Sequence, residues 1–375
     1  MRFKYFKLML IFLIGVSLFG CSSNANAEVE TISNVESEKD TNESSKEVGM
    51  QDNTRAIKVN EEDRHYIFDL DNEVNREHIY FDNRFGIEMA ADLYTSKNIN
   101  KNELHTAIVI GPPFGGVKEQ GPGVYANELA KRGFVVLAFD PAYHGYSGGS
   151  PRYTISTTMY AEDFSSSVDF LSSLDYIDKD KIAVIGICGS GGFALSAAAM
   201  DSRIKAVVTS VMYDIAGNMN KISGEQRKGM IAEGSESRTT AFLTKDYGFN
   251  KSYPDAPTEE IPENLDETNK EFYSFYGTKL GWHFNALGNF NVASLGDIMT
   301  FKSNEHISEI DAPILFIVGE NAHSKGYSEE AFANATEPKE FYEVKDANHV
   351  DLYYDTNKIP FDKIESFINQ SVDKQ

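Results

Sequence analysis

Cysteine is scarce in this chain of 375 residues, which contains only Cys21 and Cys188. Two cysteines give no disulfide framework, so each of them needs an explanation of its own. The eight histidines include no H-x-x-x-H or H-E-x-x-H pair, which are the usual helical metal-binding patterns. The sequence therefore predicts neither a metal site nor a cofactor.

Basic residues are also few. Lys and Arg number 35 against 57 Asp and Glu, and the formal net charge is −22 at pH 7. Because nucleic-acid binding needs a basic face that neutralises phosphates, we expect no nucleic-acid partner. The same charge repels anionic lipid, so contact with a membrane would need an anchor. With 41% hydrophobic and 12% aromatic residues, most of the chain should fold as a globule.

The apolar run near the N-terminus is short. Residues 8–19 follow a basic start and are too few to span a bilayer comfortably, which is typical of a signal peptide over residues 1–20. The run ends in Leu18-Phe-Gly-Cys21, which resembles the lipobox of bacterial lipoproteins. That resemblance implies lipidation of Cys21 and an exported protein held at the membrane by its N-terminal lipid alone. Ala25-Asn-Ala27 is a rival cleavage site that would release a soluble secreted protein.

Aromatic residues are absent from residues 22–60, a stretch rich in Ser, Asn, Glu and Lys. A segment of this composition cannot bury enough apolar surface to fold. We therefore predict a disordered, lipid-anchored tether over residues 21–60, followed by one folded domain over residues 61–375.

Strand and helix patterns alternate through that domain. The segments His78–Phe81 and Gly86–Tyr94 are expected to form an opening antiparallel pair. Buried strands separated by helices are then expected at Thr106–Gly111, Phe134–Asp140, Ile182–Ile187, Ala206–Val211, Pro313–Val318 and Glu340–Val344. Such alternation predicts an α/β fold with a mostly parallel, doubly wound sheet covered by helices on both faces.

Residues from about 215 to 308 interrupt the alternation. This segment is far longer than an ordinary loop and is rich in Phe and Tyr. One interpretation is a small helical subdomain with its own core, and another is a cap that lines an apolar substrate pocket. The two interpretations are compatible, and we predict a helical cap insertion here.

The stretch Ile182-Ala-Val-Ile-Gly-Ile-Cys-Gly-Ser-Gly-Gly192 carries the most chemical information. An apolar strand leads into a turn and then a helix, as in the G-x-S-x-G nucleophile elbow. Because that turn strains its central residue, the positions two residues away must be small, and Gly186 and Ser190 flank Cys188 in this way. We therefore favour Cys188 as the nucleophile, its thiolate stabilised by the start of the following helix.

Three alternatives remain for the same stretch. Ser190 would be the nucleophile if the strand extended by two residues. Gly186, Gly189 and Gly191 would form a phosphate-binding loop, with Asp214 as a ribose ligand, although their spacing is not G-x-G-x-x-G. Cys188 would simply be inert if it were an ordinary buried cysteine.

This elbow resembles that of the dienelactone-hydrolase-like branch of the α/β hydrolases, where Cys replaces Ser. Other stretches resemble a bacterial group within that branch: Gly115–Gln120, Gly145–Arg152, Gly319–Ser324 and Ala347–Tyr353. The resemblance spans roughly residues 75–370. It implies an α/β-hydrolase fold and hydrolysis of an ester, thioester or lactone, but the substrate itself does not carry over.

The expected chain order of nucleophile, acid and histidine makes His349 the base, since it follows the last predicted strand. The family's usual Gly-x-x-Asp is absent, because Gly319-Glu-Asn-Ala322 stands there. Glu320 is the nearest carboxylate and the first choice for the acid. Asp214 is the alternative, and a Cys–His dyad without an acid is also open. His323 is interpreted as structural or pocket-lining.

The oxyanion hole needs two N–H groups aimed at the developing negative charge. Gly189 follows the nucleophile and should supply one. Pro112 and Pro113 have no N–H, so Phe114 is the first residue of its loop that can supply the other. Nearby, two groups of residues are expected to support the site: Asp140 and His144 as braces of the loop, and Lys118 and Glu119 as either a buried pair or substrate contacts.

The resulting hypothesis is a hydrolase in which Cys188 forms an acyl-enzyme and His349 activates water. Its substrate would be a small acyl compound with an apolar part, as the aromatic cap suggests. The alternative is a non-catalytic surface lipoprotein that uses the fold to bind a ligand or partner, an idea prompted by the missing Gly-x-x-Asp.

Overall fold

The computed structural model describes residues 54–373. The predicted signal peptide, Cys21 as lipidation site, the rival cleavage site at residues 25–27 and most of the predicted tether lie outside these described residues. Within them, no helix is both long enough and apolar enough to cross a membrane.

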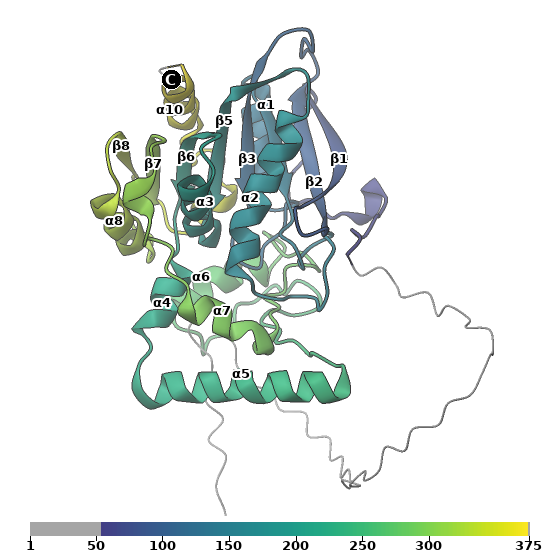
Figure 1. Ribbon diagram of the computed structural model, residues 1–375, viewed down its shortest axis with the longest axis vertical. Helices are drawn as coiled ribbons and strands as arrows, with labels where there is room; N and C mark the ends of the chain where they lie inside the picture. Colours follow the sequence, from purple (N-terminus) through teal and green to yellow (C-terminus); the bar gives the residue numbers. More distant parts are fainter. Residues whose placement is uncertain (1–53, 374–375) are drawn as a thin grey trace, which may run out of the picture.

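An eight-stranded sheet forms the centre of the domain, in the order β1-β2-β4-β3-β5-β6-β7-β8 (Figure 1). The strands are β1 (Val74–Asp82), β2 (Glu88–Ser96), β3 (His105–Gly111), β4 (Val135–Phe139), β5 (Ile177–Ile187), β6 (Ile204–Ser210), β7 (Ile314–Gly319) and β8 (Lys339–Val344). The first two pair antiparallel, β2 joins β4 antiparallel, and the remaining pairs are parallel. The central strands are buried along their length, as strands covered on both faces must be.

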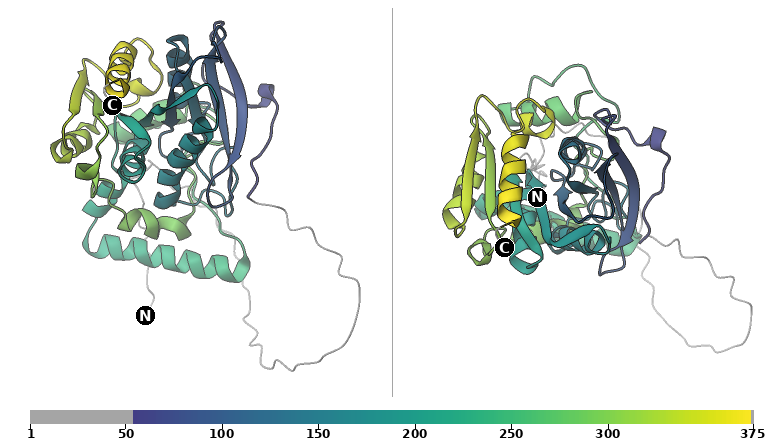
Figure 2. Two further views of the ribbon diagram at one scale, coloured as in Figure 1. Left: turned by 45° about the horizontal axis from the view of Figure 1, so that its top comes forward. Right: turned by 90° about the horizontal axis from the view of Figure 1, so that it is seen from above.

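Helices cover both faces of this sheet (Figure 1, Figure 2). They are α1 (Gly121–Lys131), α2 (Thr157–Ser172), α3 (Gly189–Met200), α8 (Lys325–Asn334), α9 (Asp351–Tyr354) and α10 (Phe361–Val372). Helices α1 and α10 contact each other over one set of strands, whereas α2 packs beside α3. The predicted α/β architecture with a mostly parallel, doubly wound sheet is therefore confirmed.

Two elements begin earlier than the sequence pattern suggested. Strand β5 starts at Ile177 rather than Ile182, since Ile177 already pairs with His105 of β3. A register shift separates it from the next pair, and the intervening polar residues 178–181 carry no apolar signal. The apolar pattern predicts a helix over Tyr125–Lys131 after the first buried strand, whereas α1 starts at Gly121. Pro122 lies in its first turn, where the missing N–H costs nothing.

The chain between β6 and β7 forms an insertion of helices joined by long loops. It contains α4 (Ile215–Lys221), α5 (Gly224–Thr244), α6 (Glu267–Tyr276) and α7 (Leu295–Thr300), with short 3-10 turns at Val292–Ser294 and Ile307–Glu309. Figure 1 shows these helices gathered beneath one end of the sheet. Helix α5 has few buried positions, whereas α6 buries Phe275 and Tyr276 against the core. The insertion thus packs the aromatic rings of α6 against the hydrophobic core of the domain.

A cluster of buried charges lies behind the loop that follows β3. The Lys118 ammonium pairs with the Glu119 carboxylate and, at 2.9 Å, with Asp140, and all three side chains are fully buried. Asp140 also accepts hydrogen bonds from the N–H groups of Lys118 and Tyr146, both at 2.8 Å. These residues therefore hold two loops together, and the Lys118–Glu119 pair is internal to the protein.

His144 braces the same region as a neutral imidazole. Its Nε2 lies 2.9 Å from the Tyr160 hydroxyl and 3.2 Å from the Thr154 carbonyl. Burial, with help from the nearby Arg152 charge, lowers the pKa of His144 to about 4.

The buried cation predicts an asymmetric response to mutation. Lys118→Met leaves Asp140 without its cation and Glu119 with only the Arg64 guanidinium, 3.7 Å away. We expect it to lower the free energy of unfolding by about 3–5 kcal/mol. Lys131→Met is the matched control. Lys131 pairs with Asp71 and Glu128 near the surface, where such pairs contribute up to about 1 kcal/mol. Urea unfolding checks both, and equal losses would contradict a structural role for Lys118.

Candidate active site

Cys188 occupies a strained turn between β5 and α3. Its φ of 54° and ψ of −119° are rarely adopted by a residue with a side chain. Backbone hydrogen bonds hold the turn: Cys188 N–H donates to the Ser210 carbonyl at 2.9 Å, and the Cys188 carbonyl accepts from Gly191 and Tyr213 at 2.9 and 3.0 Å. This geometry lifts the thiol off the end of the sheet.

The small residues around Cys188 serve this turn. A Cβ on Gly186 would stand 2.2 Å from the Ser190 carbonyl oxygen, so only glycine fits there. The Ser190 hydroxyl donates to the Pro112 carbonyl and so ties the turn to the loop after β3. These contacts explain the glycines by close backbone approach rather than by phosphate binding, and they leave Cys188 rather than Ser190 facing the pocket.

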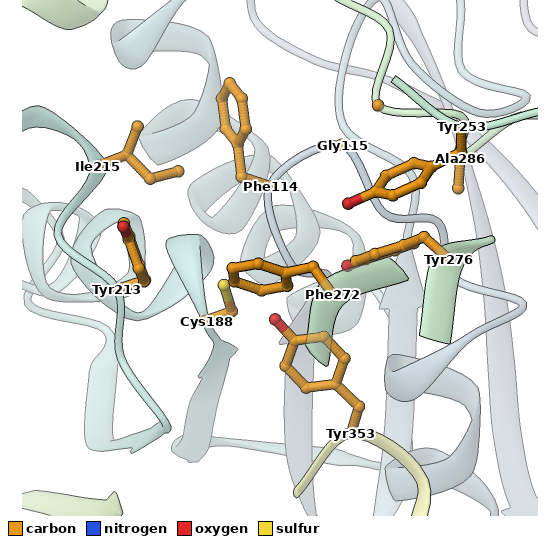
Figure 3. A pocket seen from close by; sticks show the side chains of 11 residues that line it. Phe114, Gly115, Cys188, Tyr213, Ile215, Tyr253, Phe272, Tyr276, Ala286 and Tyr353 are labelled. Atoms are coloured by element: carbon orange, nitrogen blue, oxygen red, sulfur yellow. The ribbon is translucent and has the colours of Figure 1, made fainter. Parts of the chain in front are cut away.

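A small aromatic pocket surrounds the thiol (Figure 3). Its walls are Phe114, Gly115, Cys188, Tyr213, Ile215, Tyr253, Phe272, Tyr276, Ala286, Gly288 and Tyr353. None of these side chains carries a full charge at neutral pH, and several come from the insertion. The pocket is partly open to solvent, and its cavity volume of about 30 Å³ is small for a ligand pocket. The site is therefore neutral, apolar and almost filled by its own side chains.

Three groups that can donate hydrogen bonds belong to the surroundings of the sulfur. They are the N–H groups of Gly189 and Phe114 and the Tyr353 hydroxyl, and each of them favours the thiolate. The two N–H groups are those predicted for the oxyanion hole. Burial nevertheless dominates and raises the pKa of Cys188 to about 11, because a dry pocket disfavours the thiolate. At neutral pH the resting residue is a thiol.

His349 is fully buried behind the pocket wall. Its Nε2 lies 2.9 Å from the Tyr353 hydroxyl, and its Nδ1 lies 2.6 Å from the Ser324 hydroxyl. Burial lowers the pKa of His349 well below its usual value, and the neighbouring His323, whose ring centroid is 4.6 Å away, lowers it further. The imidazole is thus a neutral group with both nitrogens engaged.

Neither predicted acid contacts His349. Glu320 is exposed, and its carboxylate accepts a hydrogen bond from the Asp346 N–H at 2.9 Å. Asp214 caps the N-terminus of α4 by accepting from the Gly217 N–H at 2.8 Å. The position expected for an acid, beside Nδ1 of His349, is taken by Ser324. The carboxylate that is missing from the sequence at Ala322 is therefore not replaced by another one in the fold. The turn after β7 offers the Ser324 hydroxyl instead.

A carboxylate from the insertion is separated from His349 by one side chain, that of His323. Glu271 of α6 accepts a hydrogen bond from the Val350 N–H at 2.9 Å and lies 3.1 Å from Nδ1 of His323. His323 is thus a bridge between the insertion and His349, and it does not line the pocket. Glu271 secures the loop that carries His349.

Among residues 54–373, no group of three or more His, Cys, Asp and Glu side chains is arranged to hold a metal ion. The model for the alpha/beta hydrolase fold matches residues 107–356, which contain the elbow, the pocket and His349. This chain belongs to the α/β-hydrolase family.

Other members of this hydrolase family are similar over most of the chain. The uncharacterized protein PA2218 of Pseudomonas aeruginosa is 43% identical over 312 residues, 81% of this chain and 82% of that protein. Its crystal structure superposes with a TM-score of 0.79 and covers 84% of this chain and 99% of that one. The uncharacterized protein YcjY of Escherichia coli is 32% identical over 71% of this chain and 88% of its own length.

A more distant structure has the same fold. The alpha/beta hydrolase GrgF from Penicillium is 18% identical, with a TM-score of 0.67, covering 80% of this chain and 99% of that one.

Sequence reasoning missed three residues of this candidate site: Ser324, Tyr353 and Glu271. Two of them lie in stretches that the resemblance had already singled out, Gly319–Ser324 and Ala347–Tyr353. Tyr353 follows His349 by four residues, which is one helical turn, and this spacing is the one signal that pointed to it.

The strained turn predicts a sharp difference between two glycines. Gly186→Ala forces a carbon against backbone, and we expect a loss of more than about 3 kcal/mol in unfolding free energy or no soluble protein. Gly326→Ala in α8 meets nothing within 4 Å and should be neutral or slightly stabilising, since alanine favours helix. Thermal unfolding of both variants decides, and a stable Gly186→Ala protein would contradict the elbow geometry.

The protonation state of His349 gives a second prediction. Its imidazole should stay neutral as the pH falls from 7.5 to 6, because its pKa is lowered by burial. His306 is an exposed control whose pKa is raised by Glu309, so it should gain its proton first. Histidine NMR titration, assigned with His349→Gln, follows both rings. Protonation of His349 above pH 6.5 would show that the ring is not buried as described.

Proposed function

We propose that this protein hydrolyses a small, uncharged ester, thioester or lactone through an acyl-enzyme on Cys188. One observation carries the proposal: the sulfur stands on a nucleophile elbow, next to two N–H donors, inside a neutral aromatic pocket. We also place the chain in the dienelactone-hydrolase-like branch, which the cysteine at the elbow supports.

In the proposed acylation step the sulfur attacks the substrate carbonyl as its proton passes toward His349. The thiol needs this base because its pKa of about 11 leaves little thiolate at neutral pH. The neutral His349 is suited to accept the proton. The N–H groups of Gly189 and Phe114, now beside the sulfur, would then stabilise the carbonyl oxyanion.

Deacylation reverses the roles with water as the nucleophile. The proton gained by His349 leaves with the alcohol or thiol, and the restored neutral imidazole then takes a proton from the attacking water. This proton passes to the sulfur when the S–C bond breaks and the acid is released. The lack of a carboxylate on Nδ1 points to a Cys–His pair supported by Ser324. Glu320 and Asp214 are both engaged elsewhere.

The pocket walls support a particular substrate class. Aromatic rings and aliphatic groups surround the sulfur, and no ionised side chain lines the space, so burying a charged acyl group there would be costly. The small volume favours a short acyl part, and longer chains must displace side chains of the insertion. The strongly negative net charge works in the same direction against anionic substrates.

For the cell location, we propose export and attachment through a lipid on Cys21. The basic start, the short apolar run and the cysteine directly after it support this. Cleavage at Ala25–Ala27 to give a soluble secreted protein is the competing outcome.

A second candidate function is ligand binding without turnover. The specific observation in its favour is that His349 reaches Cys188 only through another side chain, and that the pocket is nearly filled. The substitution of Cys188 separates the two functions, because binding survives loss of the sulfur and hydrolysis does not.

The test uses the full chain carrying Cys21→Ser, so that Cys188 is its one thiol. Nitrophenyl acetate, butyrate, hexanoate and octanoate are offered at pH 7.5, with a succinate half-ester as the charged probe. We expect the acetate to be preferred over the octanoate and the half-ester by at least about tenfold. Cys188→Ala should lower kcat/KM by at least about 1,000-fold, and intact mass should show an acyl adduct on Cys188 alone.

Tyr247→Phe serves as the control, because that tyrosine is exposed and does not line the pocket. It should keep full activity. Turnover that persists in Cys188→Ala would refute Cys188 as the nucleophile. A folded protein that forms no adduct and hydrolyses none of the esters would refute the proposed chemistry for this substrate class and favour the binding protein.

A further inference from the structure

We propose that the Tyr353 hydroxyl is a catalytic proton relay, carrying the proton of the Cys188 thiol to Nε2 of His349. This inference rests on the proposed function, since it assigns a role within the same site. It goes beyond the predicted Cys–His pair by adding a third reacting group between its two members.

The contacts place one hydroxyl between the two groups. Nε2 of His349 lies 2.9 Å from the Tyr353 oxygen, and Tyr353 lines the same small pocket as the Cys188 sulfur. Figure 3 shows the Tyr353 hydroxyl pointing toward the sulfur, and Nε2 of His349 has no other described hydrogen-bond partner. A phenol both accepts and donates, so it can take a proton on one side and release its own on the other.

The ring of Tyr353 is too well held to be a swinging gate. The residue is fully buried in α9, and its ring packs against Phe275 at 5.3 Å and Tyr276 at 6.3 Å between centroids. The preceding residue, Leu352, is fixed by a 2.7 Å hydrogen bond from the Tyr125 hydroxyl to its carbonyl. In a close-packed interior such a ring keeps its position, so the hydroxyl stays between sulfur and imidazole.

The proton balance of the step is simple. The S–H bond of Cys188 breaks as its proton joins the Tyr353 oxygen, and the original O–H proton of Tyr353 moves to Nε2 of His349. The sulfur electron pair forms the new S–C bond to the carbonyl carbon. As the bond to the leaving alcohol or thiol breaks, that group takes a proton back from His349 through Tyr353, which restores the phenol and the neutral imidazole and leaves Cys188 acylated. Water then attacks the acyl group and gives a proton to His349, and the sulfur regains this proton when the S–C bond breaks and the acid departs.

Charge considerations favour a concerted transfer. Burial raises the pKa of Tyr353 well above 10, so the phenol does not ionise at rest and works as a conduit. Nδ1 of His349 meets the Ser324 hydroxyl rather than a carboxylate, and a stable imidazolium–thiolate pair is therefore disfavoured. The proton moves only when the sulfur attacks.

The experiment measures alkylation of Cys188 by iodoacetamide, which needs no acyl substrate. Full-length Cys21→Ser protein is compared with the same protein carrying Tyr353→Phe, from pH 6 to 10, with adducts counted by mass. The relay gives the parent a rate that is independent of pH between about 6.5 and 9. In Tyr353→Phe only pre-formed thiolate reacts, so its rate should rise tenfold per pH unit toward the thiol pKa of about 11.

At pH 7 we expect alkylation and ester turnover of Tyr353→Phe to fall by about 100-fold, a typical contribution of general acid–base catalysis. Tyr247→Phe is the matched control, because it removes a tyrosine hydroxyl that is exposed and lies outside the pocket. It should keep the flat pH profile within about threefold of the parent rate.

Each outcome separates the two proposals. A Tyr353→Phe protein with the parent's flat profile overturns the relay, whether or not acyl-enzyme forms. Loss of the flat region without any acyl adduct in the parent supports the relay and overturns the hydrolase function. A parent thiol that reacts with neither iodoacetamide nor ester overturns both, since the relay would then deliver no nucleophile.

Discussion

The backbone strain at Cys188 is the constraint on which the rest of the site depends. A side-chain-bearing residue holds a positive φ only if its surroundings over-determine it. Three features fix the conformation of Cys188 together. They are the close backbone approach at Gly186, the hydrogen bond from the Ser190 hydroxyl to the Pro112 carbonyl, and the pairing of β5 with β6. The same contacts bring the Phe114 loop beside the sulfur. Nucleophile and oxyanion donors are thus products of one packing arrangement.

How much of this was predictable depends on the range of each interaction. The sheet and the elbow follow from local patterns, since an apolar strand, small residues and a helix start are all read along the chain. Cys188, Gly189 and Phe114 come together as expected for that reason. The partners of His349 were not predictable in the same way. Ser324 and Tyr353 reach it only through the folding of two loops, and Glu271 comes from an insertion that has no strand–helix rhythm.

The histidine without a carboxylate gives this site a different balance from a triad. In a triad the acid stabilises the imidazolium and fixes the tautomer. Here Ser324 fixes the ring by a hydrogen bond but adds no charge, and burial works against protonation. The site therefore favours neutral groups throughout: thiol, phenol and imidazole. The pocket wall is neutral as well. The negative charge that appears during the reaction must therefore be stabilised by the oxyanion donors, and the positive charge must be held on His349.

The small volume of the pocket also imposes an order in time. A narrow pocket with a cavity volume of about 30 Å³ beside the sulfur leaves little room for a leaving group and a second nucleophile at the same time. Departure of one molecule is the condition for arrival of the next. The pocket therefore makes the leaving group depart before the second nucleophile enters. The fate of a bound acyl group is decided by which small molecule enters the vacated space first.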